Sequence, residues 1–88
     1  MYKGWLTEVV PIDEYELLKR MHNYGVVSRH NAKTVHELVD MMTIDEGDMK
    51  ELLERLIEYS YVHAVTSDDV ARYYVTGPGI ITVCSFFT

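Results

Sequence analysis

The sequence predicts an α+β fold in which three helices are followed by a β-hairpin. Up to about residue 60, apolar side chains recur at helical spacing between capping residues. Beyond that point the pattern changes to alternation of β-branched and aromatic residues. A length of 88 residues gives a single domain spanning residues 1–88, whose core we expect over about residues 12–77.

Capping residues mark where the predicted helices begin and end. Asp13 precedes the first apolar stripe as an N-cap, and Gly25 follows it where a left-handed C-cap is needed. Thr34 and Glu37 have the spacing of a capping box, and Asp45 can cap the helix after it. We therefore expect helices at about residues 13–24, 35–42 and 46–59, with an extended connector at residues 26–33.

The hairpin is predicted from two alternating runs near the end of the chain. Residues 61–66 and 71–76 are rich in aromatic and β-branched side chains, and residues 67–70, three of them polar, separate them. A glycine, a proline and a glycine at residues 77–79 end the second strand, because proline supplies no amide donor. Four tyrosines gather at the junction of helix and hairpin and are expected to fill the core: Tyr59, Tyr61, Tyr73 and Tyr74.

Both ends of the chain are apolar. Near the start, apolar side chains fall at helical spacing as far as Pro11, and residues 80–87 are apolar on both sides of an alternation, which leaves their conformation open. A chain of 10.2 kDa has little core with which to cover both ends. We therefore predict a homodimer whose contact is formed by Trp5, Leu6, Val9, Ile81, Val83, Phe86 and Phe87.

The order of helix, extended link, helix, short turn, helix and hairpin resembles a winged helix-turn-helix domain. The resemblance covers about residues 12–77 and is most specific over residues 34–62. The end of the hairpin, residues 72–76, is similar to the Tyr-x-Leu-Thr ending of the wing in MarR-like and PadR-like transcription factors. The positions that carry the pattern are Glu37, Leu38, Ile44, Asp45, Met49, Leu53, Leu56, Tyr61 and Val62. This resemblance implies a DNA-binding transcriptional regulator.

Charge opposes that implied function. The formal net charge is -6, and Asp68 and Asp69 occupy the expected wing tip. Thr43 stands in the turn where the family usually has a small residue. The resemblance places six residues of the third helix toward the major groove, of which four are acidic: Glu46, Gly47, Asp48, Lys50, Glu51 and Glu54. DNA binding draws much of its affinity from Lys and Arg, so this helix is poorly equipped for it.

Two partners therefore remain open. If the partner is double-stranded DNA, the expected contacts are Lys50 and Arg72, with Arg29, Lys33 and Arg55 as further basic contacts. If it is a basic protein surface, the chain is an acidic adaptor or nucleic-acid mimic, and its contact face is formed by Glu46, Asp48, Glu51 and Glu54.

Catalytic chemistry is not indicated. The four histidines, His22, His30, His36 and His63, include no i, i+4 pair, and Cys84 has no second thiol for a metal site. Cys84 also lacks a basic neighbour that would lower its pKa, so we expect a buried thiol or an intermolecular disulfide. We expect no enzyme activity, no metal and no cofactor. Without a leader or a long apolar run, a cytoplasmic protein that does not enter the membrane is expected.

Overall fold

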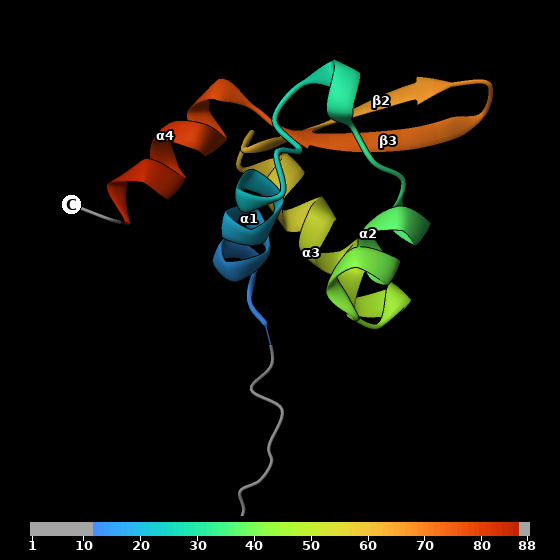
Figure 1. Cartoon of the computed structure of the whole chain (residues 1–88), viewed down its shortest axis with the longest axis horizontal. Coiled ribbons are helices and arrows are strands. Elements are labelled where there is room, and N and C mark those ends of the chain that lie inside the picture. The colour runs from blue at the N-terminus through green and yellow to red at the C-terminus, as the bar shows by residue number, and fades with distance from the viewer. Residues whose placement is uncertain (1–11, 87–88) are drawn as a thin grey trace, which may run out of the picture.

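The computed structural model describes residues 12–86. In chain order the elements are α1 (Glu14–Asn23), the 3₁₀ turn η1 (Arg29–Asn31), α2 (Val35–Met42), α3 (Glu46–Glu58), β2 (Val62–Ser67), β3 (Val70–Val75) and α4 (Gly77–Ser85). Figure 1 shows α1, α2 and α3 below the hairpin and η1 above it, with α4 at the end opposite the hairpin tip. The predicted order of three helices and a hairpin is confirmed, and α4 is added to it.

The predicted N-caps are present. The Asp13 carboxylate accepts a hydrogen bond from the amide of Glu16 at 2.8 Å. Thr34 and Glu37 form the full capping box, with bonds of 3.1 Å and 2.9 Å between each side chain and the other residue's amide. Asp45 accepts from two amides in the first turn of α3. Each cap satisfies donors that a helix start leaves free, which explains why the predicted starts agree with the structure to within one residue.

Helix ends have left-handed backbone at three positions: Gly25, Thr43 and Ser60, the last with φ 66° after α3. Gly25 has φ 80° after α1, as the sequence predicted. Thr43 ends α2 with φ 56°, although it is β-branched. A β-branched residue is rare in this region because its Cβ crowds the following carbonyl. The turn between α2 and α3 therefore adopts the conformation that a glycine would suit, with threonine in its place.

The hairpin turn is tighter than predicted. β2 and β3 pair antiparallel from Val62 opposite Val75 to Ser67 opposite Val70. This leaves only Asp68 and Asp69 in the turn, with φ 54° and 64°. Positive φ at both central residues is typical of a type I′ turn, whose twist matches that of the strands. The predicted loop of residues 67–70 was wrong, because its two outer residues belong to the strands.

The core lies between the helices and the hairpin. Tyr15 of α1 and Tyr24, the C-cap of that helix, remain exposed, by 40% and 55%. Tyr59 is also 45% exposed, which contradicts its predicted core position, whereas Tyr61, Tyr73 and Tyr74 are partly buried against the core. The fully buried large side chains are Leu17, Leu18, Met21, Val26, Leu38, Met49, Leu53, Leu56, Val75 and Val83.

The segment after the hairpin is a helix. Thr76 caps α4 by accepting a hydrogen bond from the amide of Gly79 at 3.2 Å. A Cβ on Gly79 would collide with the backbone carbonyl of Tyr61, so glycine permits the close approach of α4 to the start of the hairpin. Val83 is fully buried on the inner side of α4. Its predicted role in a subunit contact was wrong, because the domain's own core encloses it.

Candidate nucleic-acid interface

The exposed face of α3 is acidic, and its cations are paired. Lys50 lies 3.3 Å from Glu46, one turn earlier on the same helix. Arg55 lies 3.2 Å from Glu51, again one turn earlier, and 3.7 Å from Glu14 on α1. The four acidic residues predicted for a protein-interaction face, Glu46, Asp48, Glu51 and Glu54, are all exposed. Exposed pairs of this kind contribute little to stability, but they cancel the positive charge that an anion would need.

The connector between α1 and α2 pairs with the hairpin. The amide of Lys33 donates to the carbonyl of Tyr73 at 3.0 Å, and the amide of Tyr73 donates back to the carbonyl of Lys33 at 2.8 Å. Just before this bridge, Ser28 caps η1 by accepting from the amide of Asn31. This pairing places Lys33 beside Arg72, which neighbours Tyr73 in the chain. The predicted extended connector is interrupted by the 3₁₀ turn η1, which was not predicted, and neither was the connector's contact with β3.

Three basic side chains of the connector and the hairpin differ from those on α3 in that they have no carboxylate partner within residues 12–86. Arg29, Lys33 and Arg72, which we call the connector–wing cations, form no ion pair within residues 12–86. The other lysines and arginines of that range all pair with carboxylates: Lys19, Arg20, Lys50 and Arg55. Both arginines of the connector–wing set are exposed, and Lys33 is half-buried.

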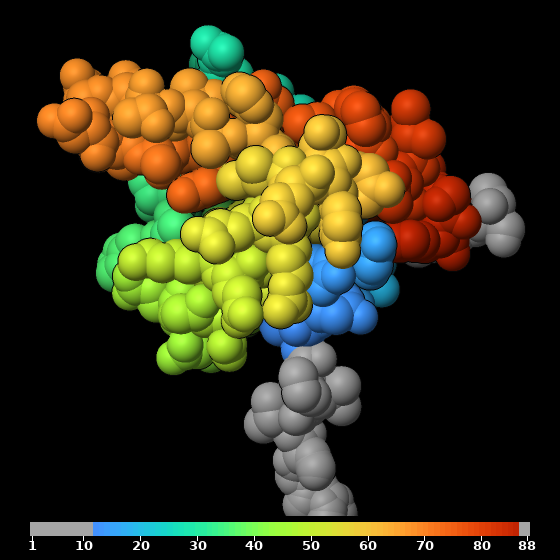
Figure 2. Space-filling view, turned by 180° about the vertical axis from the view of Figure 1, so that it is seen from behind, coloured from blue at the N-terminus to red at the C-terminus, as the bar shows by residue number. Residues whose placement is uncertain are grey.

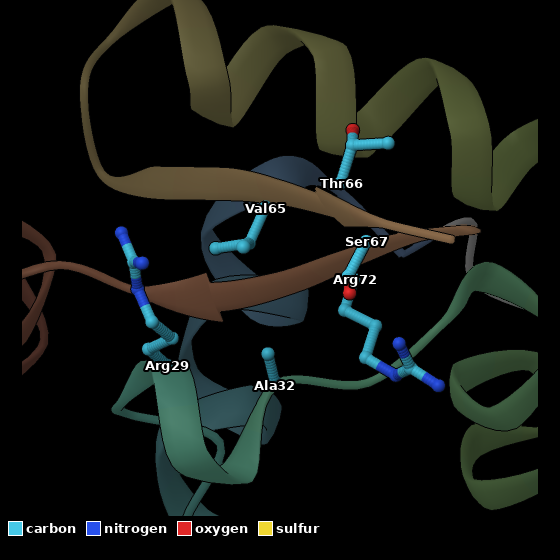
Figure 3. A pocket seen from close by; sticks show the side chains of 6 residues that line it. All are labelled: Arg29, Ala32, Val65, Thr66, Ser67 and Arg72. Carbon is cyan, nitrogen blue, oxygen red and sulfur yellow. The ribbon is translucent and has the colours of Figure 1, made fainter. Parts of the chain in front are cut away.

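A hollow of about 380 Å³ lies between η1 and the hairpin, lined by Arg29, Ala32, Val65, Thr66, Ser67 and Arg72. Arg29 comes from η1 and Arg72 from β3. Figure 3 shows these two arginines toward opposite ends of the hollow, with Ala32 and Val65 between them. Val65 is the direct cross-strand partner of Arg72, so the two side chains share one face of the sheet. No lining residue carries a carboxylate.

The carboxylate of Glu37 is affected by the charges of two connector–wing cations. Its pKa is held below the usual value, first by the hydrogen bond from the backbone amide of Thr34 and also by the positive charges of Lys33 and Arg72. Loss of hydration opposes this shift and is a larger effect than either positive charge. Two of the connector–wing cations are therefore close enough to act on one carboxylate, although neither forms an ion pair with it.

Figure 2 shows α3 at the centre of one face of the molecule, with η1 visible only at its upper rim. The predicted DNA-binding residues therefore fall into two groups. Lys50 and Arg55 lie on the acidic helix, whereas Arg29 and Arg72 line the hollow and Lys33 is next to it. The apolar and hydroxyl residues of the hollow were not predicted. The alternation of β2 places Val65 and Ser67 on one face of the strand, but no pattern in the sequence places Ala32 of the connector against that face.

An exposed aromatic surface lies where α1, the end of α3 and α4 meet (Figure 2). Tyr15 stacks on Tyr59 with ring centroids 6.2 Å apart and meets Phe86 edge-on at 6.0 Å. On α4, Ile81 is 71% exposed, and Cys84 is exposed, so the expected buried thiol was wrong. Ile81 and Phe86 belong to the predicted subunit contact, whereas the two tyrosines were not assigned to it. The remaining predicted contacts, Trp5, Leu6, Val9 and Phe87, lie outside the described residues.

Other kinds of site are not seen in the described part of the chain. Residues 12–86 contain no group of three or more His, Cys, Asp or Glu placed to hold a metal ion. Among the same residues no helix has the length and apolar character needed to cross a membrane.

Solved structures identify the fold. The chain is similar to the DNA-binding TubR fragment from Clostridium botulinum, with a TM-score of 0.74 and 18% identity over 90% of this chain and 99% of that one. It is also similar to a point mutant of Lactococcus lactis ZitR, with a TM-score of 0.65 and 10% identity over 99% of this chain and 57% of that one. No protein-family model matches the sequence, and no curated protein sequence matches it. The chain has the winged helix-turn-helix fold that its sequence predicted.

Proposed function

We propose that the chain is a DNA-binding transcriptional regulator that contacts double-stranded DNA mainly through Arg29, Lys33 and Arg72. The observation that carries this proposal is the absence of carboxylate partners for these three cations within residues 12–86. A free cation neutralises a phosphate and releases its counterion, whereas a paired cation must first give up a carboxylate. The fold is shared with a TubR fragment that is itself described as DNA-binding.

The test is a fluorescence-anisotropy titration of a labelled mixed-sequence duplex over a series of salt concentrations. Three phosphate contacts predict that log K falls against log salt with a slope of roughly −3. Arg72→Gln should make this slope shallower by about one unit. Lys50→Gln removes the same charge from α3 and is the matched control, for which we expect an unchanged slope. Absence of binding at low salt contradicts the proposal.

The alternative function is docking of α3 on a basic protein surface. It is favoured by one observation, the four exposed carboxylates Glu46, Asp48, Glu51 and Glu54 beside cations that are already paired. A lysine-rich peptide is the probe for this alternative. Charge reversal at Glu54, which forms no ion pair within residues 12–86, should then abolish peptide binding. Binding of duplex DNA with no affinity for the peptide decides against it.

We further propose that the regulator is a homodimer joined through the aromatic surface and α4. Large apolar side chains are exposed there: Tyr15 by 40%, Tyr59 by 45%, Ile81 by 71% and Phe86 by 45%. No side chain from residue 77 to residue 88 is charged, although the chain carries a net charge of -6. Two copies therefore avoid much of their mutual repulsion by meeting at this end.

Sedimentation velocity at micromolar concentration tests the dimer. Ile81→Glu should convert it to a monomer, because the change places a charge in the apolar contact. Ile57→Glu is the control, since Ile57 is a 37% exposed apolar residue on α3. A monomeric parent protein contradicts this part of the proposal.

A further inference from the structure

We propose that the hollow between η1 and the hairpin is a binding site for a phosphate ester, which Arg29 and Arg72 hold from its two ends (Figure 3). Guanidinium groups are suited to this ligand because each presents a planar fork of N–H donors to two phosphate oxygens. The inference rests on the proposed function only where the phosphate belongs to DNA. A free phosphorylated small molecule would satisfy the same chemistry.

The charges around the hollow favour an anion. The chain has 14 acidic residues against 8 basic ones, yet no lining residue is acidic and neither arginine forms an ion pair within residues 12–86. Two like charges on one hollow repel each other, and an anion between them offsets that repulsion. The carboxylate of Glu37, whose pKa Lys33 and Arg72 help to lower, already accepts a hydrogen bond from the amide of Thr34 in capping α2.

The size and lining indicate more than a bare phosphate. A volume of about 380 Å³ is near the lower end of small-molecule sites, which run from roughly 300 to 1,000 Å³. Ala32 and Val65 provide an apolar wall and Ser67 provides a hydroxyl group, while the side chain of Thr66 points to the opposite face of the strand. A phosphate joined to a sugar fits this combination, because the ring can lie on the apolar side chains while the phosphate reaches a guanidinium.

The experiment follows backbone amide shifts by NMR while three probes are added separately: inorganic phosphate, adenosine monophosphate and a short mixed-sequence duplex. We expect shifts at the amides of Ala32, Thr66 and Ser67. Arg29→Gln or Arg72→Gln should weaken the response at least about fivefold, because each removes one charge-assisted contact. Lys19→Gln changes the net charge equally but acts on a cation already paired with Glu16 on α1, so it should leave the response unchanged.

The probes separate the two sources of phosphate. Saturable shifts with the duplex alone support a site for the DNA backbone. Saturable shifts with adenosine monophosphate support a site for a free phosphorylated molecule, even if the duplex does not bind and the proposed function fails. The inference is overturned, although DNA binding stands, if the duplex shifts only the amide signals of α3 and if neither arginine substitution changes that response. A hollow that responds to none of the three probes also overturns it.

Discussion

Helix α3 and the connector–wing region both present basic side chains to solvent, but in the described part of the chain only those of α3 are paired with carboxylates. On α3, Lys50 lies 3.3 Å from Glu46 and Arg55 lies 3.2 Å from Glu51. In the connector–wing region, Arg29, Lys33 and Arg72 have no such partners within residues 12–86. The comparison teaches that the capacity of a surface for phosphate depends on whether each cation is paired, and not only on how many cations it carries.

Secondary structure explains the difference. A helix brings residues four apart into contact, so each cation of α3 meets the carboxylate one turn before it. On a strand the neighbours on the same face are two residues away or directly across the ladder. For Arg72 these neighbours are Val70, Tyr74 and the cross-strand Val65, none of which is charged. The wing therefore leaves its arginine free while the helix neutralises its own cations.

The largest effect is expected when both arginines of the hollow are removed. At roughly 0.1 M salt each phosphate contact contributes nearly tenfold to affinity, so Arg29→Gln with Arg72→Gln should weaken duplex binding about 50-fold. The salt slope should become shallower by about two units. Anisotropy titrations at several salt concentrations measure both quantities.

The matched control removes two cations from α3. Lys50→Gln with Arg55→Gln gives the same net charge, but both side chains are already opposed by carboxylates. We expect less than about a threefold loss of affinity. A loss equal to that of the two hollow arginines would break the comparison and place the duplex on α3.

The wing tip provides the next test. Its two aspartates add negative charge to the wing, and their backbone has an unfavourable conformation. Asp68 and Asp69 have φ 54° and 64°, which asparagine and glycine adopt more readily. Asp68→Asn with Asp69→Gly should raise the free energy of unfolding by about 1 kcal/mol. Urea denaturation measures this gain, and Asp68→Asn alone separates the charge effect from that of glycine. An unchanged urea midpoint would mean that Asp68 and Asp69 already offset the cost of their positive φ through another interaction.

Local features were predictable from the sequence. The caps at Asp13, Thr34 and Asp45 and the left-handed Gly25 depend on residues within a few positions of one another. The hairpin was found, but its turn was predicted too long, because Asp68 and Asp69 are not the usual asparagine and glycine of a two-residue turn. Helix propensity and capping therefore identify the helices, while the turn reflects a backbone state that its residues rarely adopt.

Long-range features were not predictable. The start of α4 has local helix signals that the prediction did not use, Thr76 as N-cap and Pro78 in the first turn, but its position depends on the buried Val83 and on the close approach of Gly79 to Tyr61. Arg29 and Arg72 were named as basic contacts, but the hollow that they share requires the connector to pair with β3 through Lys33. These contacts join residues far apart in the chain, so no short-range sequence pattern predicts them.

A smaller effect is expected from freeing a cation on α3. Glu46→Gln removes the partner of Lys50 without changing the length of the side chain. Duplex affinity should rise by roughly threefold, because one more cation becomes available and one negative charge is lost. Glu58→Gln is the control, since Glu58 lies on the same helix and forms no ion pair within residues 12–86. An equal rise in both variants would show that net charge alone is responsible.

The smallest effect is expected from Glu37, whose carboxylate lies on the connector–wing side. Its pKa in the folded protein lies below the usual 4.5, so its ionised form contributes stability above that pH and loses the contribution as the pH falls through the folded value. Glu37→Gln keeps an acceptor for the amide of Thr34 but removes the charge. The parent protein should therefore be slightly more stable than the variant near neutral pH, and this advantage should disappear in acid. Urea denaturation over a pH series measures it, and a difference that does not change with pH would assign the role of Glu37 to hydrogen bonding alone, leaving Lys33 and Arg72 free of its influence.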